Sequence, residues 1–170
     1  DFVKNSGEYN ADNWELEFVG FLPGKRESRR YVGDYIMNQN DVRDGGHFDD
    51  IAAYGGWAMD DHNPAGINNK DKPNKFYTAP SPVGIPYRSL FLVNIENLYF
   101  AGRNISVTHT AMSASRVMAT CALLGQAVGT ASAIAIKNDA TPREISEKYI
   151  CELQQMLMDD DCWLPYCKTK

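Results

Sequence analysis

The clearest pattern of apolar and polar positions lies in the second half of the chain, where a short apolar run precedes a turn and a long stretch of small residues. Residues 97–101 (Asn-Leu-Tyr-Phe-Ala) predict a strand, and the glycine-containing segment 102–104 predicts a tight turn. After a polar passage over 106–115, residues 116–136 predict a long helix. Open α/β sheets bind cofactors just beyond the carboxyl ends of their strands, so this order of elements favours a nucleotide-cofactor site.

The N-terminal half carries weaker patterns. Apolar and acidic residues alternate over 14–19, which predicts a half-buried strand that ends in the turn formed by 20–24. A short helix is predicted over 27–38, with the inward-facing residues Val32, Tyr35 and Ile36. The stretch 43–81 is rich in Gly, Asn, Asp and Pro, and loops of this length in a compact domain are usually functional or bound to a partner.

The C-terminal helix has the most specific local signal. Thr141 supplies an N-cap hydroxyl, Pro142 occupies the first helical position and Glu144 the third, and together they form a capping box. Apolar residues follow at helical spacing to about Met158, namely Ile145, Tyr149, Leu153, Met156 and Leu157. The acidic run 159–161 is unfavourable at a helix C-terminus, so it is predicted to end the helix and face water.

Composition narrows the class of protein. The chain has 170 residues, of which 44% are hydrophobic and 23% charged, and this balance is typical of a soluble globular protein. A net charge of −5 argues against nucleic acid as a partner. The basic cluster at 25–30 is too short for a nucleic-acid-binding arm.

A membrane-spanning helix is the alternative for the long helical segment. Residues 117–136 carry no charge over 20 positions, which is long enough to span a bilayer, and Gly125 and Gly129 form a small-residue seam. However, the segment is mostly Ala, Gly, Thr, Ser and Gln, and large aliphatic residues are few. We therefore expect a helix that is buried against a sheet, and no membrane partner.

The cysteine and acidic residues form no recognised metal motif. The four cysteines lack zinc or thioredoxin spacing, and a pairing of Cys162 with Cys167 is left open. Cys121 lies among apolar residues and is predicted to fill the core. The run 60–62 (Asp-Asp-His) contains metal-ligating residue types, but adjacent residues rarely converge on one ion, so we predict no metal site.

Five ordered segments carry a resemblance to a known family: 24–30, 54–57, 85–88, 97–106 and 115–118. They resemble the C-terminal portion of FAD-dependent oxidoreductases of the glutathione-reductase-like superfamily, and in particular a bacterial group of these enzymes. The likeness covers nearly all of residues 14–165. It implies a fold that is α+β in isolation and that completes an α/β Rossmann-like FAD-binding domain in the full-length protein.

The same resemblance implies that part of the enzyme is missing. Such enzymes begin with a G-x-G-x-x-G fingerprint that places the FAD pyrophosphate at a helix N-terminus, and this sequence contains none. We expect a C-terminal fragment whose partner is the missing N-terminal FAD-binding half. Within it, 1–90 would be a substrate-side portion, 91–140 the last strand and helix of the FAD-binding domain, and 141–170 a C-terminal helix and tail.

The resemblance also assigns the residues that would bind FAD: Ala101, Gly102, Arg103, Arg116, Val117 and Met118. The first three would lie at the end of the last strand, near the ribityl and phosphate groups. The start of the long helix would point at the pyrimidine side of the flavin, where free N–H groups stabilise the negative charge of the reduced ring. Gly125 and Gly129 would let this helix approach the sheet closely.

The candidates for catalysis are His109, Arg26 and Arg29. His109 lies just before the long helix and would act as the acid/base group while a hydride leaves the substrate. The two arginines would lie on the substrate side of the flavin and orient an anionic or polyhydroxylated small molecule. The alternatives are a structural histidine and a solvated basic turn, and both stay open.

The aromatic residues allow a second kind of function. Tyr54, Trp57 and Tyr87 would either line a substrate pocket or fill the core. A non-catalytic carbohydrate- or protein-binding module would instead use the aromatic residues of 43–81 as its binding surface. The oxidoreductase hypothesis is preferred because it accounts for the order of all five segments.

Overall fold

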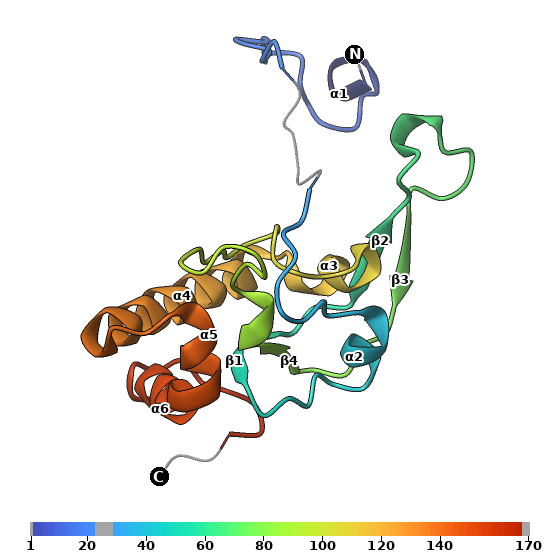
Figure 1. Cartoon of the computed structure of the whole chain (residues 1–170). Coiled ribbons are helices and arrows are strands. Elements are labelled where there is room, and N and C mark those ends of the chain that lie inside the picture. The colour runs from blue at the N-terminus through green and yellow to red at the C-terminus, as the bar shows by residue number, and fades with distance from the viewer. Residues whose placement is uncertain (1, 23–28, 168–170) are drawn as a thin grey trace.

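The chain folds into a body of helices and two small antiparallel sheets, with an N-terminal arm that extends away from it (Figure 1). The computed structural model describes residues 2–22 and 29–167. Its strands are β1 (Ile51–Gly55), β2 (Met59–His62), β3 (Asn74–Tyr77) and β4 (Val83–Pro86). Its helices are α1 (Phe2–Asn5), α2 (Gln39–Arg43), α3 (His109–Ser115), α4 (Met118–Asn138), α5 (Pro142–Glu144) and α6 (Ile150–Asp159), with short turns η1 (Gly66–Asn68), η2 (Tyr87–Ser89) and η3 (Ile145–Tyr149). The predicted α+β class is confirmed.

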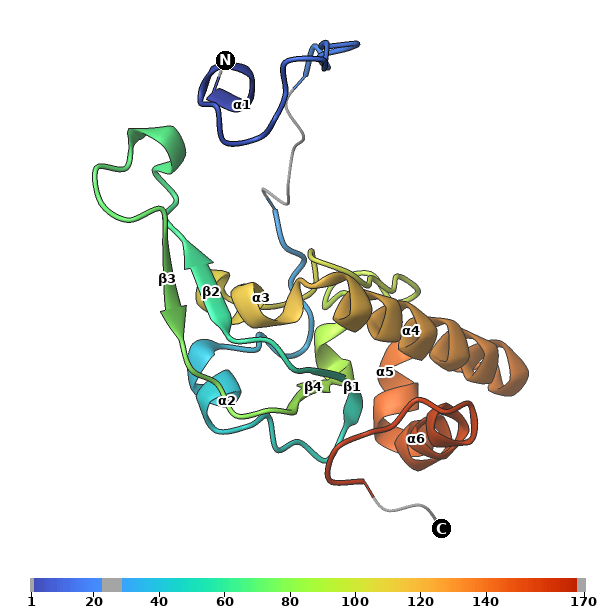
Figure 2. The same ribbon diagram turned by 180° about the vertical axis from the view of Figure 1, so that it is seen from behind.

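The two sheets have different roles. β1 and β4 pair antiparallel at the centre of the body, with Tyr54 opposite Gly84, and most of their residues are buried. β2 and β3 form a second antiparallel pair, in which Asp61 lies opposite Lys75. Figure 2 shows this hairpin projecting from the body alongside α3, and β2 packs against that helix. The hairpin therefore brings polar residues of β2 close to the start of α3.

The core lies between the β1–β4 sheet and helices α4 and α6. Tyr87 is fully buried within it, and its hydroxyl donates a 2.9 Å hydrogen bond to the carbonyl oxygen of Pro142. The hydroxyl of Tyr99 lies 2.8 Å away. Burial raises the pKa of the Tyr87 hydroxyl far above its usual value, so the group stays neutral. Of the two alternatives for Tyr87, the structure supports the core role.

The predicted strand over 97–101 is wrong. The local pairing is an isolated bridge between Phe91 and Tyr99, and the segment is otherwise irregular. A regular strand needs a ladder of backbone hydrogen bonds, and the described residues supply a partner at one point only. The turn that follows is confirmed, because Gly102 has a φ of +97°, a conformation that favours glycine.

The polar passage predicted over 106–115 contains helix α3. Thr108 caps this helix, and its side chain accepts a hydrogen bond from the backbone N–H of Ala111. The Ser and Thr residues of this passage lower its helix propensity, so its sequence does not predict a helix. Their effect is outweighed by tertiary packing, since residues 111–115 are all buried. His109 is consequently the first residue of a helix rather than a loop residue.

The long helix α4 is confirmed, and it begins at Met118. Its orientation differs from the expectation, because Gly125 and Gly129 are exposed and a Cβ added to either would meet nothing within 4 Å. The buried face packs against β1 and α6 and consists of Thr120, Leu124, Ala127, Ala131, Ile134 and Ala135. Among the described residues, therefore, the two glycines do not bring the helix close to a sheet.

Among the described residues, α4 is the one helix that is long and apolar enough to cross a membrane. Its mean hydropathy is 1.5. Core helices of globular proteins meet the same criteria. In this chain, 28% of the most apolar 18-residue stretch of α4 is buried. The helix makes its main contacts with β1 and α6. The other face of the helix is open to solvent.

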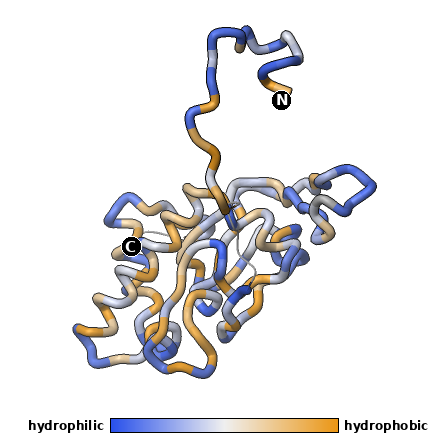
Figure 3. Tube along the Cα trace, turned by 90° about the horizontal axis from the view of Figure 1, so that it is seen from above, coloured by the Kyte–Doolittle hydropathy of each residue, from blue (hydrophilic) through white to orange (hydrophobic). Residues whose placement is uncertain are grey.

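The N-terminal arm contains no strand over 14–19, so that prediction is wrong. Its apolar side chains are exposed, with 73% of Trp14 and 80% of Leu16 accessible to solvent. Figure 3 shows hydrophobic and hydrophilic residues succeeding each other along this arm. The pattern does predict an amphipathic strand, but the described residues provide no neighbouring strand to pair with it.

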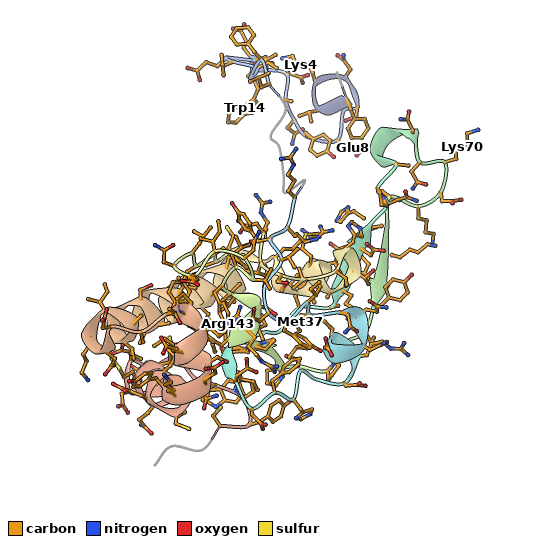
Figure 4. All side chains as sticks on the ribbon, in the orientation of Figure 1. Lys4, Glu8, Trp14, Met37, Lys70 and Arg143 are labelled. Atoms are coloured by element: carbon orange, nitrogen blue, oxygen red, sulfur yellow. The ribbon has the colours of Figure 1, made fainter. Side chains whose placement is uncertain are left out.

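The arm is held locally by one lysine. The Nζ of Lys4 donates hydrogen bonds of 2.9, 2.8 and 2.7 Å to the carbonyl oxygens of Ala11, Asp12 and Trp14. Figure 4 labels Lys4 and Trp14 in this part of the chain. An ammonium group has three donors, and here each one satisfies a backbone acceptor. The arm therefore has local structure of its own despite its exposed apolar residues.

The helix predicted over 27–38 is also wrong in its described part, 29–38. This segment is extended, and Met37 forms a bridge with Val107 and donates its N–H to the carbonyl of Ser106 at 3.0 Å. Val32 and Ile36 are half-exposed, whereas Met37 is buried. Helix α2 begins afterwards, where Asn38 acts as the N-cap of a capping box.

The C-terminal helix follows the prediction closely. The capping box of Thr141 and Glu144 is present, with Pro142 at the first helical position. Its helix continues through the π-helical turn η3 into α6, and residues 159–161 are exposed, as expected. Cys162 and Cys167 are not joined, and no disulfide forms among the described residues.

The capping box makes a prediction about pH. Hydrogen bonds from Lys148 and from Thr141 lower the pKa of Glu144 from its ordinary 4.5 to about 2. Because the folded state favours the carboxylate, its stabilising effect is complete above about pH 4.5 and is lost as the pH falls toward 2. We expect Glu144→Gln to reduce the loss of stability over this interval in urea unfolding series. Glu147→Gln, which removes an exposed carboxylate from the following turn of the same helical segment, should leave this loss unaltered.

Candidate functional site

A cluster of titratable residues lies where β2 meets the start of α3. The Nε2 atom of His109 is 2.9 Å from Oδ1 of Asp61 and 3.3 Å from the carbonyl oxygen of His62. The side chain of His109 is 41% exposed and that of Asp61 is 25% exposed. The imidazole is thus held against β2 while one side stays open to solvent. This is a suitable arrangement for a group that exchanges a proton with a ligand.

Asp60 organises the other half of the cluster. Its Oδ1 accepts a hydrogen bond from Asn74 on β3 at 2.9 Å, and its Oδ2 lies 3.2 Å from Nε2 of His62. Arg116, at the end of α3, donates to the Asp60 carbonyl at 3.1 Å and to Oδ2 at 3.3 Å. The hydrogen bond from Asn74 is the main cause of a lowered pKa at Asp60, and His62 and Arg116 add to it. Asp60 therefore stays ionised and ties the hairpin to the helices.

A cavity of about 610 Å³ borders this cluster. It is lined by residues from α2, from the β2–β3 hairpin and from α3: Gln39, Arg43, Met59, Asp61, Phe76, Tyr77, Thr78 and Thr110. Its lining combines aromatic surface with one carboxylate and one guanidinium, which suits a small polar molecule. Asp61 connects the cavity to His109.

The basic segment is only partly described. Arg26 lies outside the described residues, and Arg29 is exposed in an extended stretch. The neighbouring Arg30 reaches α3, where its Nη1 lies 3.9 Å from the sulfur of Met112. The ring of Tyr31 stacks on Phe100 with centroids 4.9 Å apart. The chain that follows the basic cluster is therefore in contact with α3 and with Phe100, which directly precedes the predicted cofactor residues 101–103.

The predicted strand-end segment forms an accessible turn. Ala101 and Gly102 are half-buried, Arg103 is exposed, and the carbonyl oxygen of Asn104 accepts a 2.9 Å hydrogen bond from the N–H of Tyr31. A Cβ on Gly102 would meet only Oδ1 of Asn104, at 3.7 Å, so the space above the glycine backbone is open. A ligand can approach the backbone closely here.

The start of α4 is open as well. Its N-cap residue, Val117, provides no side-chain hydrogen bond, and Met118 is 90% exposed. The first N–H groups of a helix have no partner within the helix, so at this end they are available to an acceptor. Arg116, by contrast, donates hydrogen bonds to Asp60, although its buried Nε has no hydrogen-bond partner in the part of the chain that the structure describes.

A second cavity, of about 680 Å³, lies elsewhere. It is bounded by residues 47–49, by α6 and by the tail, and it includes Cys151, Cys167 and Tyr166. None of the site residues predicted from the sequence lines it. The 610 Å³ cavity, by contrast, borders the histidine and carboxylate cluster through Asp61.

Sequence reasoning found part of this cluster. It selected His109, but it considered the 60–62 run only as a metal site and did not connect Asp61 with His109. No group of three or more potential metal ligands occurs among the described residues. Tyr54 packs on Trp163 with ring centroids 5.2 Å apart, and Trp57 is half-exposed. Neither aromatic residue lines the 610 Å³ cavity.

Comparison with known families gives the class of the protein, which is an oxidoreductase. The family model described as FAD dependent oxidoreductase matches residues 2–157. The chain belongs to this family. No curated protein and no solved structure matches it.

Family membership implies FAD, and the residues at two places fit this cofactor. The start of α4 offers uncapped N–H donors, which bind anionic oxygens, and the Gly102 turn offers open backbone beside the cation of Arg103. Both places coincide with residues that were assigned to cofactor binding from the sequence. Their role in binding stays a prediction.

Proposed function

We propose that this chain is the C-terminal part of an enzyme that transfers a hydride between a small-molecule substrate and FAD. The observation that carries the proposal is the uncapped start of α4, next to α3 and its histidine, in a chain of this family. The seven residues of α3 span about 10 Å, so His109 and the start of α4 lie within the dimensions of one active site.

Two segments of this chain would hold the cofactor. Residues 101–103 would bind its ribityl and phosphate portion through the glycine backbone and Arg103. The first turn of α4, with Val117 and Met118, would donate backbone N–H groups to the pyrimidine edge of the ring. When bound, FAD supplies the two-electron acceptor, and negative charge on its reduced ring is stabilised by donors of this kind.

The substrate would be handled by the basic segment and His109. Arg29, together with Arg26, would orient an anionic or polyhydroxylated molecule, because guanidinium groups bind such oxygens through several donors. His109 would accept the substrate's hydroxyl proton, since imidazole is the side chain suited to proton exchange near neutral pH. The 610 Å³ cavity beside Asp61 has room for a small polar substrate.

A second part of the proposal is that the N-terminal FAD-binding half is a separate portion of polypeptide that packs on this chain. Two apolar surfaces support it. The arm exposes Trp14, Leu16, Phe18 and Phe21, and α4 exposes Met118, Ile136 and the two glycines between them. Exposed apolar surface of this extent usually marks a contact with another element.

The first test is the flavin content of the 170-residue chain. Because this sequence lacks the dinucleotide fingerprint, we expect the purified chain to bind FAD weakly or not at all. The absorbance spectrum after incubation with FAD and gel filtration measures the bound fraction. A stoichiometric yellow complex would contradict the proposed need for an N-terminal half.

The second test concerns Arg103. In the complete protein, expressed with its upstream coding region, Arg103→Ala should reduce flavin retention because a cation beside the cofactor is lost. The flavin-to-protein ratio from absorbance measures this effect. Lys70→Ala, which removes a positive charge near the tip of the β2–β3 hairpin, should retain flavin like the unmodified protein. Equal flavin content in both variants would remove Arg103 from the site.

A further inference from the structure

The geometry points to Asp61 as a positioning residue for His109, one that holds the imidazole with its proton on Nε2 and leaves Nδ1 to exchange protons with the substrate. This inference deepens the proposed function and rests on it for the role of His109. The arrangement of the two side chains stands on its own, however, and is measurable without any cofactor.

The first argument is the burial of the carboxylate. Oδ1 of Asp61 is shielded from solvent and has no aligned hydrogen bond among the described residues. Buried carboxylate oxygens require a donor or a cation, because leaving one unpaired costs free energy. The close contact of Oδ1 among the described residues is Nε2 of His109 at 2.9 Å, an ion-pair distance at which the N–H is not aligned on this oxygen. Asp61 thus depends on the same nitrogen that it orients.

The second argument concerns the neighbours of that nitrogen. Nε2 of His109 lies between two acceptors, the Asp61 carboxylate and the carbonyl oxygen of His62 at 3.3 Å. A nitrogen without a proton would face repulsion from both oxygens. In neutral imidazole one nitrogen donates and the other accepts, so a proton on Nε2 leaves the lone pair on Nδ1.

The third argument is that the hairpin fixes the carboxylate. Asp61 lies within β2, whose register with β3 runs from Met59 opposite Tyr77 to His62 opposite Asn74. The adjacent Asp60 is bonded across the hairpin to Asn74 and to Arg116 of the helical segment. Asp61 therefore has a fixed backbone on a paired strand, as a residue that positions another requires.

The consequence for the reaction is a defined proton path. When Nδ1 of His109 gains the substrate's proton, the ring becomes a cation, and the Asp61 carboxylate group 2.9 Å from Nε2 is placed to stabilise that charge. The proton is passed on to solvent, because the imidazole is partly exposed. Asp61 does not itself contact the substrate in this role.

The test is an imidazole nitrogen spectrum of the 170-residue chain labelled with ¹⁵N-histidine. The chain has three histidines, so each one gives a resolvable pair of nitrogen signals, and replacing His47 or His62 with Gln assigns them. At alkaline pH, where imidazoles are neutral, we expect His109 to show the Nε2–H form alone. In Asp61→Ala the Nδ1–H form should become measurable. An unchanged tautomer distribution in this variant would overturn the inference, as would an Nδ1–H form in the unmodified chain.

Two matched variants complete the design. Asp71→Ala removes an exposed carboxylate from the same hairpin and should leave the His109 signals unchanged. Asp61→Glu keeps a carboxylate and should restore the Nε2–H form, which separates positioning from a loss of folding. Circular dichroism verifies the fold of each variant. Failure of Asp61→Glu to restore the signal in a folded chain would count against a specific carboxylate role.

A kinetic measurement distinguishes this inference from the proposed function. In the complete flavin-loaded enzyme, Asp61→Ala should lower kcat about 10- to 100-fold, with KM and flavin content little changed, since residues that orient a functional histidine have effects of this size. A changed tautomer with an unchanged kcat would support the positioning of His109 and refute its acid/base role. An unchanged tautomer refutes the positioning whatever the rate.

Discussion

Replacing Gly46 with alanine is expected to lower the free energy of unfolding by about 3 kcal/mol, because left-handed strain and a backbone clash act together. Gly46 has a φ of +64°, and its added Cβ would meet the carbonyl oxygen of Gly84, with the nitrogen of Gly84 2.6 Å away. The N–H of Gly84 in turn donates to the carbonyl of Gly45 at 3.1 Å. The clash would therefore separate this turn from β4, and urea unfolding of the chain measures the result.

Gly125→Ala provides the matched control with the opposite sign. Gly125 lies in the middle of α4, its added Cβ would meet nothing within 4 Å, and its backbone is helical. Alanine in such a position should stabilise the helix by about 0.5–1 kcal/mol. Destabilisation by Gly125→Ala would mean that a close neighbour exists on this face. Equal effects of the two substitutions would contradict the distinction between the two glycines.

The largest expected effect on activity comes from His109→Gln. If His109 takes the substrate's proton, its loss in the complete flavin-loaded enzyme should reduce kcat by about 10²- to 10⁴-fold. Glutamine keeps a polar side chain of similar length but cannot exchange a proton at neutral pH. Stopped-flow reduction of the flavin by substrate measures the step directly. Flavin content should stay constant, because His109 lies at the start of α3 and not in the cofactor turn.

His47→Gln serves as the control for this substitution. His47 stacks on Tyr166 with ring centroids 4.0 Å apart, next to the larger cavity, and it takes no part in the β2–α3 cluster. We expect it to retain the rate of the unmodified enzyme. A loss of less than about threefold for His109→Gln would leave the histidine a structural role only.

Sequence patterns predicted the structure correctly where an element depends only on residues close to it in the chain. The capping box at Thr141, the turn at Gly102 and the long helix α4 all depend on residues within a few positions, and all three are present. Prediction failed where the structure depends on a distant partner. The strand predicted over 14–19 has the correct alternation but no neighbouring strand among the residues that the structure describes, and 97–101 has its bridge at a single residue.

The orientation of α4 shows a second limit of sequence patterns. A stripe of small residues allows close approach, but it does not reveal which face of the helix is approached. Leu124 and Ile134 lie on the buried face, and their apolar area outweighs the steric advantage of the glycines. Large hydrophobic residues are few in this helix, but their positions indicate its buried face better than the glycines do.

The candidate site shows the same difference between residues that can be predicted locally and residues that depend on a distant partner. His109 was selected from its place before the long helix, whereas its partner Asp61 lies far away in the sequence and reaches it only through the β2–β3 hairpin. Asp60, Asp61 and His62 were evaluated as a run of adjacent residues. On a strand, neighbouring side chains point to opposite faces, so this run serves two different partners, Arg116 and His109.

The π-helical turn η3 has a consequence for how much variation the C-terminal helix tolerates. Ile145, Leu153 and Leu157 are fully buried, and Tyr149 continues the same four-residue repeat. Four residues exceed one α-helical turn by about 40° of rotation, and the wider π turn compensates for that excess. A deletion of one residue within it would rotate both leucines away from their contacts even though composition and propensity were preserved. The length of η3 is therefore constrained, and not only its composition.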